Sequence, residues 1–470
     1  MKTRMETDSI GTLEIPVEAY YGVQSLRAKN NFPITGTPLH PTFIQNLAKI
    51  KKAAAISNRN SGTLSAKKAR AIVLACDELI KGEFQDEFIV DGIQGGAGTS
   101  ANMNANEVIA NRAIELLGGQ KGDYSIVHPN DHVNMAQSTN DVIPTAGKLT
   151  VLDLLPPLIS WLKKLEDALM EKSKAFDHIL KMGRTQLEDA VPMRLGQSFH
   201  AYASVIGRDI ARLEKAKNEL YTVNLGGTAI GTAINTSPYY LTHVVPTLAS
   251  ITGYPLVQAD DLFDATENLD GFVVISNTLK TCAVNLSKIC NDLRLLSSGP
   301  RTGIGEINLP PMQNGSSIMP GKINPVIPEV VTQVAYHVIG NDTTITMAAE
   351  AGQMELNAFE PVIFYHLFSS VTSMTGAVES LVKNCILGIT ANEEHCSELV
   401  SKSVGITTAL CPYIGYQKAA SIAKTSLKTG ASIPSLVLKE NLLSSGELSR
   451  ILDPYALTVP QKAQTGTLAG

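Results

Sequence analysis

Apolar residues spaced alternately by three and four positions run through the middle of the chain and predict long amphipathic helices. The strictest stretch is 269–296, and its apolar positions are Phe272, Ile275, Leu279, Cys282, Leu286, Ile289, Leu293 and Leu296. A similar face runs through 194–220, and two more long helical stretches lie at 328–351 and 360–385. Strict alternation of apolar and polar residues, the pattern of a strand, is scarce. The sequence therefore predicts an all-α protein built around a central bundle of long helices.

The helical pattern changes on either side of this bundle. Residues 1–40 look irregular, and shorter helices are predicted from about residue 42, over 65–80 and over about 103–117. After about Glu394, glycines and prolines interrupt the pattern and predict only brief helices. We therefore expect three domains, which are a mostly helical N-terminal domain (1–139), the bundle (140–394) and a small C-terminal helical domain (395–470).

The helix predicted over 269–296 also carries apolar residues away from its main face, namely Val273, Val274, Ala283, Val284 and Leu295. A helix that is apolar nearly all round needs neighbours on every side, and the long helices of one chain cannot supply them. We infer that bundles from several copies of the chain pack together in a homo-oligomer.

Composition narrows the classes of partner and compartment. The formal net charge is −5, which argues against nucleic acid or an acidic membrane surface as the main partner. The first ten residues are polar and show no secretory signal, and no uncharged apolar run reaches the roughly 18 residues that span a bilayer. The six cysteines are scattered, as expected of free thiols in a reducing cytoplasm. The nine histidines form no ligand pair such as HExxH, so no metal is expected.

Four loops concentrate glycine and small polar residues before predicted helices, at 95–100, 137–141, 183–189 and 315–324. A helix N-terminus offers unpaired N–H groups and the positive end of the helix dipole, and hydroxyl groups add further donors. Any one of these loops is explained by ordinary helix capping. Four of them together with Lys322 favour convergence on a small polyanion.

The loop at 315–325 reads GSSIMPGKINP and superficially resembles a phosphate-binding loop. Five residues rather than four separate its glycines, and Ile323 stands where that motif needs Ser or Thr. Nucleotide binding is therefore disfavoured.

The same segment resembles the GSSxMPxKxNP signature of the fumarase/aspartase superfamily. Further landmarks of that superfamily are similar at 19–24, 98–100, 138–141, 183–185 and 298–301. The resemblance implies three domains, a central helical bundle that joins a multi-helix core in a homotetramer, and active sites shared between subunits.

Within the superfamily the chain is most similar to the ammonia-lyase branch. Gln186 follows Thr185 where fumarases usually carry His, and Thr139 stands where they usually carry a second Ser. The resemblance implies reversible elimination of ammonia from L-aspartate to give fumarate, without a cofactor. A fumarate hydratase, a non-catalytic structural paralogue and a lyase acting on a larger substituted succinate remain alternatives.

The resemblance also implies roles for individual residues. Ser316 is the base that removes a proton, and a glycine-flanked loop would have to stabilise its alkoxide and close over the substrate. Donors to the carboxylate next to the reacting carbon are Thr99, Ser138, Thr139 and Ser317. Lys322 and Asn324 hold the other carboxylate, and the residues facing the amine are Asn140, Thr185 and Gln186. Glu329 either orients the residue at 186 or is simply an acid at a helix N-terminus.

Overall fold

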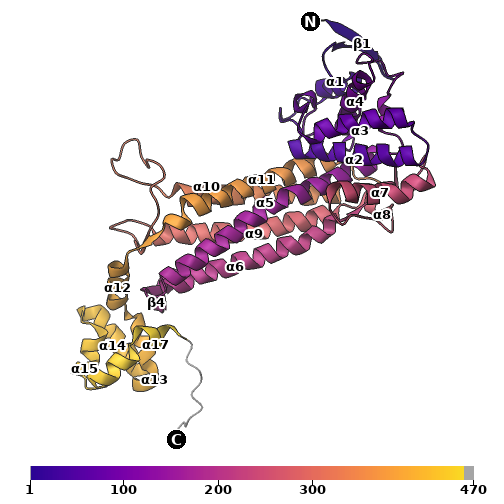
Figure 1. The fold of residues 1–470 in the computed structure, drawn as a ribbon. Helices are drawn as coiled ribbons and strands as arrows, with labels where there is room; N and C mark the ends of the chain where they lie inside the picture. Colours follow the sequence, from indigo (N-terminus) through magenta and orange to yellow (C-terminus); the bar gives the residue numbers. More distant parts are fainter. Residues whose placement is uncertain (1, 460–470) are drawn as a thin grey trace. The chain divides into compact units, whose positions relative to one another are not determined.

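The structure is a computed structural model that describes residues 2–459, and it is predominantly helical. Within these residues the chain forms two compact units, each discontinuous in sequence. The first unit comprises 2–160, 209–284 and 334–376, and the second comprises 161–208, 285–333 and 377–459. The division falls inside the long helices α5 (Thr139–Ala175), α6 (Leu195–Ala216), α9 (Asp270–Leu296), α10 (Val326–Glu350) and α11 (Glu360–Asn384) (Figure 1). The all-α prediction is confirmed.

The apolar stripe predicted over 269–296 is the buried face of α9, and all eight of its residues are buried. In the first unit, Phe272 of α9 meets Phe364 of α11 edge to face, with ring centroids 5.1 Å apart. In the second unit, the hydroxyl of Tyr202 on α6 donates a 2.9 Å hydrogen bond to Asp292 Oδ2 on α9. The spacing of apolar residues therefore places the interior of the bundle correctly within each unit.

Helix α5 is long and apolar enough, by length and composition alone, to cross a membrane. However, 72% of its most apolar window is buried inside the protein. Burial of this kind is typical of the core helix of a bundle, and a core helix can be as apolar as a spanning one.

The first 40 residues are more regular than the sequence predicts. Strands β1 (Thr3–Thr7) and β2 (Thr12–Pro16) form an antiparallel hairpin, and α1 spans Val23–Asn31. The Arg4 guanidinium donates hydrogen bonds to the backbone carbonyls of Pro16, Val17, Ala19 and Tyr21. This tertiary contact fixes the path after the hairpin, and short half-exposed strands leave little periodicity in the sequence. Helices α2 (Pro41–Asn60), α3 (Ala66–Ile80) and α4 (Thr99–Leu116) follow.

The segment 183–189, predicted as a loop before a helix, is instead the end of a β-hairpin, so that prediction is wrong. Strands β3 (Leu180–Thr185) and β4 (Glu188–Arg194) pair antiparallel, and α6 begins only at Leu195. The pairing is irregular at Gly183, where a Cβ would lie 2.7 Å from the carbonyl oxygen of Val191. Glycine is needed there because the two backbones approach so closely.

The remaining elements are short. Helices α7 (Pro238–Thr252) and α8 (Asp264–Glu267) precede α9, and the two-residue strands β5 (Thr222–Val223) and β6 (Val257–Gln258) pair with each other, as do β7 (Ile307–Asn308) and β8 (Thr390–Ala391).

The C-terminal part of the second unit has a small apolar core of its own. The helices there are α12 (Glu393–Lys402), α13 (Cys411–Ile414), α14 (Tyr416–Thr429), α15 (Ile433–Lys439), α16 (Ser445–Ile451) and α17 (Pro454–Thr458). Buried residues of these helices and of the 3₁₀ helix Val404–Leu410 form one apolar cluster, which includes Leu410, Ile422 and Val437. The three-domain division stays a prediction, and residues 460–470 of the predicted C-terminal domain lie outside the described residues.

Candidate active site

Thr99, the first residue of α4, lies at a sharp entry into that helix. Gly98 before it has φ +86°, and a Cβ on Gly98 would lie 2.8 Å from the side chain of Ile143. Only glycine therefore fits this position comfortably. The Thr99 hydroxyl donates a 2.7 Å hydrogen bond to the carbonyl of Gly96, which holds it at the helix N-terminus.

The N-terminus of α5 carries the candidates Ser138, Thr139 and Asn140. The Ser138 hydroxyl accepts a 3.3 Å hydrogen bond from the backbone N–H of Asn140, as a capping serine does. Thr139 Oγ1 accepts a 3.2 Å hydrogen bond from the side-chain amide of Asn102, on the first turn of α4. The first unit thus brings together the helix starts that carry Thr99 and Thr139.

A buried lysine lies behind these two helix starts, and the sequence analysis missed it. The ammonium of Lys51, on α2, donates hydrogen bonds to Asn102 Oδ1 (2.7 Å), Asn134 Oδ1 (2.8 Å) and Gln137 Oε1 (3.0 Å). Lys51 is fully buried, and burial lowers its pKa to about 7. Its side chain orders the amides that support the Ser138–Asn140 segment. A basic residue amid the alanines and isoleucines of α2 is the only sequence signal for it.

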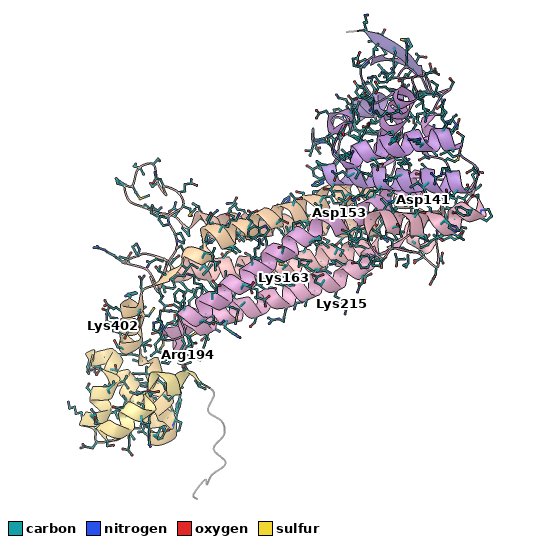
Figure 2. The ribbon with its side chains drawn as sticks, in the orientation of Figure 1. Asp141, Asp153, Lys163, Arg194, Lys215 and Lys402 are labelled. Atoms are coloured by element: carbon teal, nitrogen blue, oxygen red, sulfur yellow. The ribbon has the colours of Figure 1, made fainter. Side chains whose placement is uncertain are left out.

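Asp141, which is labelled in Figure 2, also holds the Ser138–Asn140 segment through its carboxylate. Its Oδ1 accepts from the backbone N–H of Ser138 at 2.9 Å, and its Oδ2 accepts from those of Gly226 and Thr228 at 3.0 and 3.1 Å. Burial nevertheless raises the pKa of this carboxyl to about 6. The side-chain amide of Asn140 in turn donates to the carbonyl of Ala229 at 2.7 Å. These bonds tie the start of α5 to the segment 224–229.

In the second unit, hydrogen bonds join the two ends of the loop 315–324, which is predicted to be catalytic. The backbone N–H of Gly315 donates to the carbonyl of Lys322 at 2.9 Å, and the Asn324 side-chain amide donates to the carbonyl of Gly315 at 2.6 Å. A Cβ on Gly315 would lie 2.5 Å from the carbonyl oxygen of Lys322, so glycine is needed where the two ends of the loop approach each other. Lys322 itself is exposed on the loop.

Ser316 Oγ lies inside this loop and faces two backbone donors. It accepts hydrogen bonds from the N–H groups of Ile318 at 3.2 Å and Met319 at 2.9 Å. Ser317 beside it is exposed. Two N–H groups aimed at one hydroxyl oxygen favour its negatively charged form. The role of Ser316 as the base stays a prediction.

The hairpin of β3 and β4 presents Thr185 and Gln186 at its exposed end. The turn consists of Gln186 and Leu187, whose φ angles are +57° and +66°. Two consecutive positive φ angles are typical of a type I′ turn, which normally takes Asn and Gly. The turn therefore holds Gln186 in a strained backbone conformation.

The predicted site residues divide between the two units. Those in the first unit are Thr99, Ser138, Thr139 and Asn140, and those in the second are Thr185, Gln186, Ser316, Ser317, Lys322, Asn324 and Glu329. Glu329 is half-buried in the first turn of α10.

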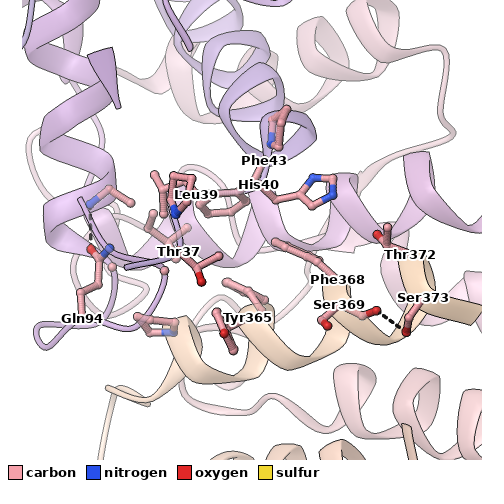
Figure 3. A pocket seen from close by; sticks show the side chains of 18 residues that line it. Thr37, Leu39, His40, Phe43, Gln94, Tyr365, Phe368, Ser369, Thr372 and Ser373 are labelled. Carbon is pink, nitrogen blue, oxygen red and sulfur yellow. Dashed lines mark hydrogen bonds between the residues drawn. The ribbon is translucent and has the colours of Figure 1, made fainter. Parts of the chain in front are cut away.

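Two cavities of the first unit are lined by described residues. One of about 600 Å³ is lined by Thr99 and Ser100 and also by Arg27, and therefore borders the candidate site. The other, of about 440 Å³, is lined by aromatic side chains that include Phe43, Tyr365 and Phe368 (Figure 3). Among the described residues that line the second cavity there is no lysine or arginine. It does not suit a dicarboxylate.

The described part of the chain holds no cluster of three or more His, Cys, Asp or Glu side chains placed to bind a metal ion. Its six cysteines are free thiols.

Comparison with known proteins relates this architecture to a family. The family described as Lyase matches residues 11–340, and the one described as Fumarase C C-terminus matches 406–459. Aspartate ammonia-lyases of Pseudomonas fluorescens and a Bacillus species are 56% and 53% identical, over 97% of this chain and 96% and 98% of theirs. A solved fumarate lyase:delta crystallin of Brucella melitensis, bound to cobalt, is 49% identical with a TM-score of 0.95, over 98% of this chain and all of that one. The chain belongs to the fumarase/aspartase superfamily of lyases.

Proposed function

We propose that the protein is an aspartate ammonia-lyase, a carbon–nitrogen lyase that converts L-aspartate reversibly into fumarate and ammonia. Relatives that carry this name match nearly the whole chain at 53% and 56% identity. The residues Thr139 and Gln186, at the two positions where fumarases usually differ, support the same choice.

The observation that carries the proposed chemistry is the pair of backbone N–H groups aimed at Ser316 Oγ. The Ser316 alkoxide takes the proton from the carbon next to the β-carboxylate of aspartate. The electron pair of that C–H bond moves into the β-carboxylate and gives a doubly charged enediolate. This intermediate then forms the double bond of fumarate and releases ammonia. No cofactor is needed, because stabilisation of the enediolate supplies the acidity.

Stabilisation of the enediolate is assigned to hydroxyl groups at helix N-termini. Thr99 and Thr139 lie at the starts of α4 and α5, where N–H groups and helix dipoles favour negative charge. The Thr99 hydroxyl has one hydrogen to donate, so it donates to the substrate by leaving the Gly96 carbonyl. Ser138 and Ser317 complete this set of donors. The buried Lys51 behind the two helix starts adds positive potential without exposing a cation to the substrate.

The remaining candidates recognise the other ends of the substrate. Lys322 and Asn324 bind the α-carboxylate, since an ammonium and an amide both donate to it. Neutral oxygen atoms of Asn140, Thr185 and Gln186 accept from the substrate ammonium. Glu329 orients Gln186 or stabilises the first turn of α10.

The proposal includes a cytoplasmic homotetramer whose active sites are shared between subunits. Val274, Val284 and Leu295 support an oligomer, because these apolar residues of α9 are 40%, 49% and 42% exposed in the single chain. Light scattering coupled to size-exclusion chromatography tests it, and a monomer mass would contradict it.

The function is tested by following the ultraviolet absorbance of fumarate with L-aspartate and, in parallel, with L-malate. We expect fumarate from L-aspartate and none from L-malate. Fumarate from L-malate alone would identify a fumarate hydratase. No product from either substrate would favour the structural paralogue or a lyase for a larger substituted succinate. Either outcome, fumarate from L-malate alone or no fumarate at all, would refute the proposal.

A further inference from the structure

Three charged residues of the second unit, Lys181, Arg184 and Glu306, form a buried ion cluster that the proposed chemistry does not use. The Glu306 side chain is completely buried. Arg184 Nη1 donates a 2.7 Å hydrogen bond to Glu306 Oε1. Lys181 Nζ lies 3.2 Å from Glu306 Oε2, an ion pair without hydrogen-bond geometry, and donates instead to the Met182 carbonyl at 2.8 Å.

A buried ion cluster of this kind is weak as a device for stability. The loss of hydration of the buried charges offsets much of their mutual attraction, and apolar residues of similar volume often serve stability as well. The cluster can instead fix the orientation of its side chains, because a guanidinium and a carboxylate form hydrogen bonds in a defined geometry. The geometry of the cluster therefore suits the orientation of a neighbouring part of the chain.

Glu306 is itself held firmly by the backbone around it. Its N–H donates to the carbonyl of Leu296 at the end of α9, and its carbonyl accepts from the N–H of Asn392, both at 2.9 Å. The thiol of Cys396, on α12, also contacts this carbonyl at 3.6 Å. The carboxylate is thus fixed relative to α9 and α12, and can act as an anchor for a neighbouring strand.

That neighbouring strand is β3, and the two basic residues reach Glu306 from different places along it. Lys181 and Arg184 are three positions apart, so a regular strand would direct them to opposite faces. The pairing of β3 and β4 is irregular between Met182 and Arg184, and irregular pairing increases the local twist. Both side chains consequently meet one carboxylate, Arg184 from the exposed end of the hairpin and Lys181 nearer its base.

Arg184 directly precedes Thr185 and Gln186, the residues assigned to the substrate amine. These two residues are exposed, and the turn that follows has the strained φ angles of Gln186 and Leu187. The bond from Arg184 to Glu306 ties this end of the strand to a buried anchor, and Arg184 Nε also lies 4.0 Å from Asp189 Oδ1 on β4. A strained, exposed turn keeps one geometry only if the strand beneath it is fixed.

We propose that Arg184 is a positioning residue, which holds Thr185 and Gln186 in the orientation needed to accept the substrate ammonium by pairing with the buried Glu306. The inference rests on the proposed function, because the role of Thr185 and Gln186 comes from it. Lys181 balances charge at the base of the hairpin and does not set the geometry of its end.

Two single variants separate positioning from stability. Arg184→Gln leaves the Lys181–Glu306 pair, and Lys181→Met leaves the Arg184–Glu306 pair, so each retains one cation and one carboxylate. Initial rates of the reverse reaction give separate KM values for ammonia and fumarate. In Arg184→Gln we expect the KM for ammonia to rise roughly tenfold to a hundredfold, because small misplacements of binding groups have effects of this size. The KM for fumarate should change less than about twofold.

Lys181→Met should keep both KM values near those of the wild type, and Arg184→Lys should recover part of the loss because it restores the charge but not the planar fork. Equal shifts in Arg184→Gln and Lys181→Met, or an unchanged ammonia KM in Arg184→Gln, would overturn the inference.

Hydrogen exchange supplies a readout that does not depend on turnover. Backbone amides of residues 183–189 should exchange faster in Arg184→Gln than in Lys181→Met or the wild type, and equal exchange would refute the positioning role. If the wild type makes no fumarate from L-aspartate, the proposed function fails, while the exchange comparison still decides whether Arg184 holds the hairpin. Should Arg184→Gln not fold, Arg184→Lys takes its place, and native exchange and native ammonia KM in that variant would overturn the inference.

Discussion

Asn102 Oδ1 accepts a 2.7 Å hydrogen bond from the ammonium of Lys51, although neither side chain has more than 1% of its surface exposed. The amide nitrogen of the same Asn102 donates to Thr139 Oγ1 at 3.2 Å. One asparagine therefore connects a buried cation to a hydroxyl that is assigned to the reacting carboxylate. The two bonds also fix the orientation of the Asn102 amide, because its oxygen must face the ammonium.

The buried Lys51 should make stability depend on pH in a predictable direction. Burial lowers its pKa from 10.5 to about 7. Between these values the unfolded chain carries a proton on Lys51 that the folded protein lacks, so the free energy of unfolding rises with pH. Relative to Lys51→Met, the wild type should therefore gain stability as the pH increases from about 7 toward about 10. Denaturant titrations of both proteins across this range test the sign, and parallel curves would contradict it.

The same residue should matter for turnover at neutral pH. In Lys51→Met the amide of Asn102 loses its orienting partner, and the enediolate loses a nearby amine that is partly protonated at pH 7. We expect kcat to fall by about tenfold to a hundredfold, with a smaller change in KM. Lys52→Met is a matched control, because its ammonium pairs with Asp77 at 2.6 Å on the partly exposed side of the same helix. An equal loss of kcat in both variants would mean that Lys51 has no special role.

Ser316 and Ser317 are adjacent hydroxyls with different assigned roles. Ser316→Ala removes the base, so kcat should fall by about 10²- to 10⁴-fold, the usual contribution of a positioned acid or base. Ser317→Ala removes one donor to the enediolate and should cost less. Single-turnover measurements with L-aspartate separate the chemical step from product release. Near-wild-type turnover in Ser316→Ala, or a larger loss in Ser317→Ala, would refute the assignment of the base.

The long helices are predictable because their apolar stripes are a local property of the sequence. Helix α9 was expected over 269–296 and spans Asp270–Leu296. The N-terminal hairpin was not predictable in the same way. Its strands have five residues each, and the path after them depends on Arg4 reaching carbonyls that are 12 to 17 positions away. A contact of that kind leaves no periodic pattern.

The residues of the candidate site also differ in how far the sequence alone predicts them. The loop around Ser316 is recognisable because its residues are contiguous, and its signature is long. The roles of Lys51 and Asp141 were missed, because their importance comes from burial and from partners as far as 87 residues away. A lysine or aspartate in a helical sequence is ordinarily a surface residue. Only the folded chain shows that these two are buried.

The turn between β3 and β4 was also unpredictable, and it offers a direct test of strain. Leu187 has φ +66° and is 70% exposed, and a left-handed conformation costs a residue with a side chain roughly 1–2 kcal/mol relative to glycine. Leu187→Gly should therefore raise the free energy of unfolding by about 1 kcal/mol. The matched control is Leu427→Gly in α14, where a leucine of 73% exposure has a helical conformation, and the same change should lower stability by about 1 kcal/mol. Denaturant unfolding of both variants measures the two effects. If Leu187→Gly destabilises the protein as much as Leu427→Gly, the turn is not strained. If it stabilises the protein while the KM for ammonia rises, the rigidity of a leucine in the turn contributes to holding Gln186 in place.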